Sequence, residues 1–264
     1  MFIMFRALWQ YRHFVFSSIR NEFVTRFARS TLGGLWMILN PLAQVAIYAL
    51  ILANVLSAKM EGIDNKYSFA IYLTAGIMAW NLFSEIILRC LNLFIANGNL
   101  MKKVMFPKIV LPAIVVGTTL LDNIMLFIAT LGVFALLGHM PTVQILWLPV
   151  LTVATIALGV SFGLILGVLN VFIRDIGQVV PIVLQIAFWF TPIVYPLTII
   201  PESYRHLLSF NPMYPIVKGY QDVLFYGVAP QFTQVGVIII ASLFLLGLGF
   251  FLFQRASEEM VDTL

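Results

Sequence analysis

Six long apolar runs, separated by short polar breaks, dominate this sequence. Each run approaches or exceeds the roughly 20 residues that a helix needs to cross the hydrocarbon core of a bilayer. The runs cover residues 35–56, 68–88, 110–137, 146–173, 179–197 and 235–253. Hydrophobic residues make up 61% of the chain and charged residues 10%, whereas an average soluble protein has about 25% charged residues. The sequence therefore predicts an all-α, polytopic membrane protein with six transmembrane helices over 35–253.

The orientation of these helices follows from the placement of lysine and arginine. If the N-terminus lies in the cytosol, the cytosolic segments hold ten Lys and Arg residues and the outer segments hold four. Six crossings return the chain to its starting side. The sequence therefore predicts a multi-pass protein with both termini cytoplasmic. Because no polar block is long enough for a soluble module, we expect a single domain over 1–264.

Residues 5–30 predict an amphipathic helix rather than a span. Apolar side chains recur every three or four residues, and polar or cationic side chains occupy the opposite side. The apolar side consists of Leu8, Tyr11, Val15, Ile19, Phe23 and Phe27, and the polar side of Arg6, Gln10, His13, Ser17, Arg20 and Asn21. Such a helix lies in the plane of the membrane interface. A packed cytosolic helix is the alternative that the same pattern allows.

Residues 97–112 form a basic break between the second and third runs. Lys102, Lys103 and Lys108 gather around Phe106-Pro107, in a chain that has few charges elsewhere. In the predicted orientation this break is a cytosolic loop. It offers a surface to a cytosolic partner, which we expect to supply energy.

The segment between the fifth and sixth runs, 196–233, is the longest outer segment. Five prolines divide it into short pieces that remain rich in apolar and aromatic residues. Two helices too short to cross, hinged at Asn211-Pro212, would dip into the outer leaflet and return, which requires protein or a cavity around them. This predicts a pair of short gate helices over the outer mouth of a pathway. A hairpin on the outer surface without a gating role is the alternative.

Charged residues inside the apolar runs are costly and usually mark function. Glu85 precedes Arg89 by four residues, so the two can pair along one helix face, and a structural pair is the favoured interpretation. Asp122 lies about midway along the third run. It either pairs with a polar group on a neighbouring helix or lines a hydrated lumen, and the sequence leaves both possibilities open.

Two further patterns allow more than one interpretation. The aromatic run Phe188-Trp189-Phe190 forms either a lipid-facing belt or a surface on which sugar rings stack. Gly159, Gly163 and Gly167 form overlapping GxxxG steps that let helices approach closely. Packing within the chain is favoured for these glycines over dimerisation.

Several function classes lack the residues that they need. The chain has no GxxxxGK[ST] motif with which to hold ATP, no HExxH and no CxxC. Its three histidines and single Cys90 form no metal set. The net charge of +4 carries no indication of nucleic-acid binding. We therefore expect no catalytic residues, no metal and no cofactor in this chain.

Four stretches of the chain, taken in order, carry a family likeness. They are Arg26 to Trp36 leading to Asn40-Pro41-Leu42, Asn97 to Pro107, Asn170 with Arg174-Asp175-Ile176, and Asn211-Pro212-Met213 with Tyr220 and Leu224. Together they resemble ABC-2 type polysaccharide export permeases, in which Phe27 is commonly Tyr. The likeness covers nearly the whole chain and is greatest to members that export O-antigen.

This resemblance implies a permease subunit that is not itself an enzyme. It implies a homodimer in the bacterial inner membrane, bound to a separate ATP-binding subunit that carries ATP and Mg. The cargo would be an O-antigen polysaccharide linked to undecaprenyl pyrophosphate, moved from the cytoplasmic to the periplasmic side. Membrane lipids would contact the remaining surface, and the first and fifth spans would line the channel.

The resemblance also implies roles for individual residues. Contact with the ATPase would fall to Asn97, Leu100, Lys102, Lys103, Phe106, Pro107, Arg174 and Asp175. The substrate channel would include Tyr48, Phe188, Trp189 and Tyr195, and the gate Asn211, Pro212 and Tyr214. Arg26 and Arg29 would suit the pyrophosphate. Ordinary positive-inside charge binding anionic lipid is the alternative for these two arginines.

Other functions remain open from the sequence. The nearest alternative is an ABC permease for another lipid-linked polymer, such as teichoic acid or capsule, or for a drug or lipid. A membrane-embedded transferase is a second alternative, although its acidic candidates Glu61, Asp64, Glu202 and Asp222 are widely scattered. A stand-alone channel or carrier is a third.

Overall fold

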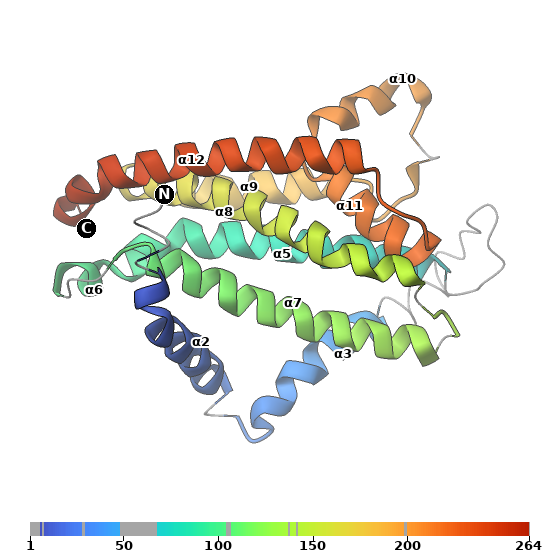
Figure 1. The fold of residues 1–264 in the computed structure, drawn as a ribbon, viewed down its shortest axis with the longest axis horizontal. Helices are drawn as coiled ribbons and strands as arrows, with labels where there is room; N and C mark the ends of the chain where they lie inside the picture. Colours follow the sequence, from blue (N-terminus) through green and yellow to red (C-terminus); the bar gives the residue numbers. More distant parts are fainter. Residues whose placement is uncertain are drawn as a thin grey trace.

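The computed structural model describes residues 6, 8–27, 30–47, 68–103, 107–136, 138–140, 142–197 and 200–263. Every regular element among these residues is helical, which confirms the all-α prediction for this part of the chain (Figure 1). The longer elements are α2 (Arg12–Phe27), α3 (Trp36–Ile47), α5 (Ser68–Ala96), α7 (Val110–Leu136), α8 (Leu148–Phe172), α9 (Ile176–Trp189) and α12 (Phe232–Thr263). The shorter ones are η1 (Gly33–Leu35), α6 (Gly98–Lys103), η3 (Val143–Trp147), α10 (Glu202–Arg205), η5 (His206–Phe210), α11 (Tyr214–Gln221) and η6 (Asp222–Tyr226).

Four helical stretches are long and apolar enough to cross a membrane. They are Ser68–Ala96, Val110–Leu136, Val143–Phe172 and Phe232–Ala256. They correspond to the second, third, fourth and sixth predicted runs, although the second and sixth helices extend well beyond the apolar residues that predicted them. The described helices thus match four of the six predicted spans in length and apolar composition.

The fifth run differs from the prediction, and the first is described only in part. In the first, α3 accounts for 36–47, and residues 48–56 lie outside the described part of the chain. In the fifth, α9 has 14 residues, or about 21 Å at 1.5 Å per residue, which is less than the roughly 30 Å of the hydrocarbon core. The predicted end at 197 was too late. Pro192 explains this, because a proline disfavours helical backbone in the residue before it.

The long helix α5 forms the centre of the bundle and is buried along most of its length. It packs against α7, α8 and α11. Three glycines of α8 permit the close approach of α8: a Cβ at Gly163 would lie 2.7 Å from Cys90 Cβ, and a Cβ at Gly167 would clash with the Cys90 carbonyl oxygen. Gly159 faces Ile86 of α5 in the same way. The prediction that these glycines serve packing within the chain is therefore confirmed.

The N-terminal helix α2 turns its apolar side toward α7. Ile19 and Phe23 are buried, and Ile19 lies against Gly117 of α7. Arg20 and Asn21 are exposed on the other side. The two faces are therefore as predicted: Ile19 and Phe23 pack on the bundle, Leu8, Tyr11 and Val15 are half-buried, and the place of the helix in the membrane interface stays a prediction. The exposed outer side still presents aromatic residues, Trp9 and Phe16.

The helices place the predicted contact segments at one end of the bundle and the predicted gate at the other (Figure 1). The helix α6 and the turn between α8 and α9 lie at the end where α12 finishes, whereas α10 and α11 lie at the opposite end. The end of α12 packs on the α6 region: Phe253 stacks on Phe94 with ring centroids 5.2 Å apart, and Met260 and Met101 are buried in the same apolar cluster.

Candidate functional site

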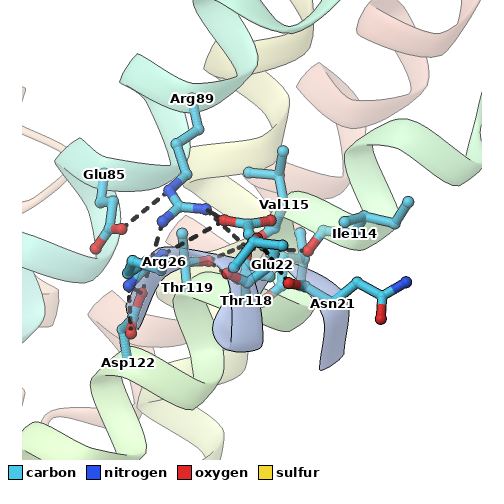
Figure 2. Close-up of polar contacts among 12 residues, drawn as sticks. Asn21, Glu22, Arg26, Glu85, Arg89, Ile114, Val115, Thr118, Thr119 and Asp122 are labelled. Carbon is cyan, nitrogen blue, oxygen red and sulfur yellow. Dashed lines mark hydrogen bonds and ion pairs between the residues drawn. The ribbon is translucent and has the colours of Figure 1, made fainter. Parts of the chain in front are cut away.

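Five charged side chains from three helices meet beside α2 (Figure 2). Arg26 of α2 donates to both carboxylate oxygens of Asp122 on α7, each at 3.0 Å, and it also pairs with Glu22 at 3.4 Å. Arg89 of α5 donates to Glu85 at 3.0 Å and also binds Glu22. The cluster therefore joins α2, α5 and α7.

This arrangement answers two questions that the sequence raised. The predicted pair between Glu85 and Arg89 is confirmed. Asp122 pairs with Arg26 on a neighbouring helix, which confirms the first interpretation, and it also lines a polar cavity, whereas a hydrated lumen stays a prediction. A role for Glu22 was not predicted from the sequence. The only indication in the sequence was an acidic residue within a basic helix. Glu22 and Arg89 are 67 residues apart, a separation that helical spacing cannot bridge.

A polar cavity of about 260 Å³ opens beside the charged cluster, between α3, α5 and α7. Its polar lining comprises Arg26, Asn40, Gln44, Asn81, Glu85, Thr119, Asp122 and Asn123, and Trp36 also contributes to the wall. Asn123 is fixed by donating to the Met78 carbonyl at 3.1 Å. Amides, carboxylates and a guanidinium at the depth of a membrane-spanning helix indicate a function, because polar groups there are costly.

A larger groove of about 510 Å³ lies between α5 and α9. Its lining combines aromatic side chains with amides and a hydroxyl, namely Trp80, Phe188, Trp189, Asn81, Gln185 and Ser84. Phe188 packs edge-on against Trp80 with ring centroids 5.7 Å apart, whereas Trp189 and Phe190 are 60% and 69% exposed. Two rings of the predicted aromatic run thus face outward, and one is half-buried. Tyr48, also predicted to line the channel, lies outside the described residues.

A hydrogen-bond network holds the turn that follows α9. Tyr72 of α5 donates to the Pro192 carbonyl at 3.1 Å, and Gln221 of α11 donates to the same oxygen at 3.1 Å. Asn211 donates to Thr191 Oγ1 at 2.8 Å, and its own side-chain oxygen accepts from the Met213 backbone N–H. The structure therefore ties α5, α9 and α11 together at the predicted gate end.

The remaining predicted gate and channel residues surround this network. Pro212 and Tyr214 are half-buried at the start of α11, and the Tyr195 hydroxyl donates to the Trp189 carbonyl at 2.8 Å. Tyr72 and Gln221 were not predicted, because neither stands out within its own segment. The only signal was that both are polar in otherwise apolar surroundings.

Asp222 follows directly at the first residue of η6, a π-helical turn. Its side chain is buried, and burial raises the pKa of the carboxyl to about 6 while the nearby Lys218 ammonium opposes the shift. π-Helical turns are rare and occur often at functional sites. The gate end therefore contains a carboxyl whose charge changes close to neutral pH.

At the opposite end, the residues predicted to contact an ATPase are arranged on two exposed segments. Asn97 links α5 to α6, because its carbonyl accepts from Met101 N–H and its side chain donates to the Leu93 carbonyl. Leu100 and Lys102 are exposed on α6, which ends at Lys103. Pro107 is half-buried, and Phe106 lies outside the described residues.

The second exposed segment is the turn between α8 and α9. Arg174 and Asp175 are exposed there. Asn170 anchors this turn: its side chain donates to the Leu91 carbonyl of α5 at 2.9 Å, and Gly177 leaves room for its side-chain oxygen. The turn is therefore fastened to the helix that leads into α6.

Only one of the two arginines predicted to contact pyrophosphate lies among the described residues. Arg26 is engaged by Asp122 and Glu22, so its charge is already balanced within the chain. Arg29 lies outside the described residues. Among the described residues no group of three or more His, Cys, Asp or Glu side chains is arranged to hold a metal ion.

Comparison with known proteins identifies a family for the chain that has this geometry. Residues 13–225 match the family described as ABC-2 type transporter. The O-antigen export system permease protein RfbA of Myxococcus xanthus is 29% identical over 261 residues, covering 98% of each chain. The RfbA protein of Klebsiella pneumoniae is 26% identical over 248 residues, covering 92% of each. The polysialic acid transport protein KpsM of Escherichia coli is 27% identical over 244 residues, covering 92% of this chain and 93% of that protein.

The family match includes the ion cluster, the groove beside α9 and the network at the gate end. It covers well over half of the sequence, and the similar proteins align with this chain from end to end. The chain therefore belongs to the ABC-2 type transporter family.

Proposed function

We propose that this chain is the transmembrane subunit of an ATP-driven exporter of O-antigen polysaccharide. The cargo would be linked to undecaprenyl pyrophosphate and would move from the cytoplasmic to the periplasmic side of the bacterial inner membrane. The observation that carries the proposal is the full-length likeness to proteins named O-antigen export permeases.

The energy would come from a separate, Wzt-like ATP-binding subunit that holds ATP and Mg. Its contact surface on this chain would be α6 together with the turn at Arg174 and Asp175, which lie at the same end of the bundle. Both segments are attached to α5, one through Asn97 and the other through Asn170. A push on either segment would therefore move α5, and with it the groove that α5 shares with α9.

The pathway for the glycan would form where two copies of this chain meet along α9. Only Val180 of α9 is buried within the chain, and a stripe of apolar residues faces outward. The groove between α5 and α9 carries aromatic rings and amides, which can stack on and hydrogen-bond to sugar rings in turn. Weak, repeated contacts of this kind suit a polymer that must move.

The outer end of this pathway would be closed by the short helices around Asn211. Their network holds the turn after α9 from two sides, through Tyr72 and Gln221. Release of these hydrogen bonds would let the turn and α9 move together. This gives the gate a defined point of attachment to the channel helix.

The proposal is tested with the complex purified from its source strain. We expect the chain to co-purify with the ATPase encoded beside it, and lipid-linked polymer to change the rate of ATP hydrolysis. Deletion of the gene should leave the polymer inside the cell and remove it from the surface. Unchanged surface polymer after deletion would contradict the proposal.

A second candidate cargo is a capsule polysaccharide, which the likeness to KpsM supports. The same deletion separates the two candidates. O-antigen loss removes polymer attached to lipopolysaccharide, whereas capsule loss removes a polymer that is extracted separately. The chemical analysis of the polymer that accumulates in the cell identifies the cargo.

A further inference from the structure

The cavity between α3, α5 and α7 has a composition that none of the roles above requires. It lies beside the groove of α9 rather than within it, and Asn81 lines both. Its wall combines side-chain amides, ion-paired carboxylates and the indole of Trp36 with the apolar side chains of Leu82, Met125 and Leu126. The question is which class of ligand such a wall can bind.

Charge excludes ions as the preferred ligands. The neighbouring cluster holds three carboxylates and two guanidinium groups, so an anion would meet a net negative charge. A cation would be repelled by the guanidinium groups at both carboxylates of the wall, because Asp122 is bound by Arg26 and Glu85 is bound by Arg89. A neutral ligand avoids both penalties.

The amides of the wall disfavour apolar ligands. A lipid chain in this cavity would leave the Asn40 and Asn81 side chains without hydrogen-bond partners, which costs free energy for each group. A ligand rich in hydroxyl groups would instead donate to the carboxylates and exchange hydrogen bonds with Asn40 and Asn81. Trp36 supplies a flat apolar surface for the C–H face of a sugar ring.

Size narrows the choice further. At about 260 Å³ the cavity is slightly smaller than the roughly 300–1,000 Å³ of typical small-molecule pockets. It therefore suits one ring rather than a chain of several. Arg26 brings α2 to the wall of this cavity, while α3, α5 and α7 supply the other lining groups.

We propose that this cavity is a binding site for a single neutral sugar residue of the transported glycan, with Asn40, Asn81, Asp122 and Glu85 as its polar ligands and Trp36 as its stacking surface. The inference rests on the proposed function, because it assumes a glycan cargo. The cavity would then be a side pocket of the groove of α9. This pocket would hold the polymer in place between cycles of ATP hydrolysis. Arg26 orients Asp122 toward the sugar and is a positioning residue.

The test measures binding of defined sugars to the complete transporter in lipid nanodiscs. The probes are methyl glycosides of mannose, galactose, glucose and rhamnose, followed by saturation-transfer difference NMR. We expect ring-proton signals for at least one glycoside with the wild-type complex. Asn40→Leu, which alters the cavity and not the groove, should weaken that binding about tenfold, as expected for a lost hydrogen bond.

Two comparison variants locate the binding. Asn92→Leu changes an exposed amide on α5 that donates to the Leu88 carbonyl outside the cavity, and it should leave the signals unchanged. Gln185→Leu changes the groove alone. Loss of binding in Gln185→Leu with normal binding in Asn40→Leu would overturn the inference, because the sugar would then bind in the groove. Displacement of the glycosides by inorganic pyrophosphate would overturn it as well.

Gel-filtration profiles and basal ATP hydrolysis establish that each variant complex is folded. Export of polymer by the wild-type strain, compared with the deletion strain, tests the proposed function separately from the sugar site. If export depends on the gene but no glycoside binds in a manner sensitive to Asn40→Leu, the inference fails and the proposed function stands. If deletion of the gene leaves surface polymer unchanged, the proposed function fails first.

Discussion

Asp222 shows how one buried carboxyl can control the stability of the gate end. The carboxyl lies in a π-helical turn with Lys218 as the nearby cation, and burial raises its pKa from an ordinary 3.8 to about 6. A raised pKa means that the folded protein holds the proton more tightly than the unfolded chain does. The protonated side chain therefore supports the fold below about pH 4, and this support is lost as pH rises through about 6.

The substitution Asp222→Asn should remove this pH dependence. The amide stays neutral, so the variant should be more stable than the wild type above pH 6, by at most about 3 kcal/mol for a shift of this size. Thermal unfolding of the purified complex at about pH 5 and about pH 7.5 measures the difference. Glu202→Gln, at an exposed position of α10, is the control and should change neither value. A variant that is less stable than the wild type at the higher pH would show that the carboxylate itself is needed.

At the scale of helices, the packing of α8 on α5 depends on the absence of side chains. Gly163 faces Cys90 so closely that even a methyl group has no room, because its Cβ would lie 2.7 Å from Cys90 Cβ. On α7, by contrast, Gly132 has open space around it. The same substitution should therefore have opposite effects at the two positions.

Gly163→Ala should destabilise the protein by about 1–3 kcal/mol, the usual cost of overpacking a core. Gly132→Ala should stabilise it by about 1 kcal/mol or less, because alanine favours a helix over glycine. Unfolding of both variants in a denaturant series in detergent measures the two changes. Equal effects at both positions would mean that α5 and α8 are not in direct contact at Gly163.

The end of α12 supports the segment predicted to meet the ATPase. Phe253 stacks on Phe94 at the end of α5, next to α6. Phe253→Ala should leave a cavity there and cost about 3–5 kcal/mol if the site does not collapse. If α6 transmits force, ATP hydrolysis should continue while export per ATP falls. Phe251→Ala, at an exposed position of the same helix, is the control. Equal loss of ATP hydrolysis and export in Phe253→Ala would instead indicate general unfolding.

The sequence predicted these elements unevenly, for physical reasons. Runs such as 110–137 are uniformly apolar, so their helices follow from the requirement to cross a bilayer, and α7 matches that prediction closely. Pro192 indicates the early end of α9, but the apolar residues continue past it, so apolar length alone predicts a longer helix. The ion cluster was only half predictable: Glu85 and Arg89 share one helix face, but Arg26 and Asp122 are 96 residues apart. Their pairing depends on how α2 docks, which no local pattern encodes.

At the scale of the whole molecule, α9 is the helix along which we propose that a second copy of the chain binds. Its exposed apolar stripe includes Val179, Ile182, Val183 and Ile186, spaced as one face of a helix. Lipid could cover such a stripe, but the stripe adjoins a groove lined by the amides of Asn81 and Gln185, which lipid would leave unsatisfied. A second copy facing the first across this groove would enclose the polar groups in a shared pathway. The helix α12 also exposes apolar residues, but neither the cavity nor the groove described above includes a residue of α12.

This difference predicts the result of crosslinking between copies. In a background with Cys90→Ala, Val183→Cys on α9 should yield a covalent dimer with a short bis-maleimide reagent in native membranes. Ile240→Cys, on an exposed apolar face of α12, should yield monomer. Both cysteines lie in apolar helices with similar access to the reagent. If both positions faced only lipid, the two variants would therefore give the same crosslinking result. If Ile240→Cys forms the dimer and Val183→Cys does not, the copies meet along α12, and the groove between α5 and α9 faces lipid instead of a pathway. Because the charged cluster and its cavity adjoin that groove through Asn81, the same result would also separate the cavity from any route that the glycan takes.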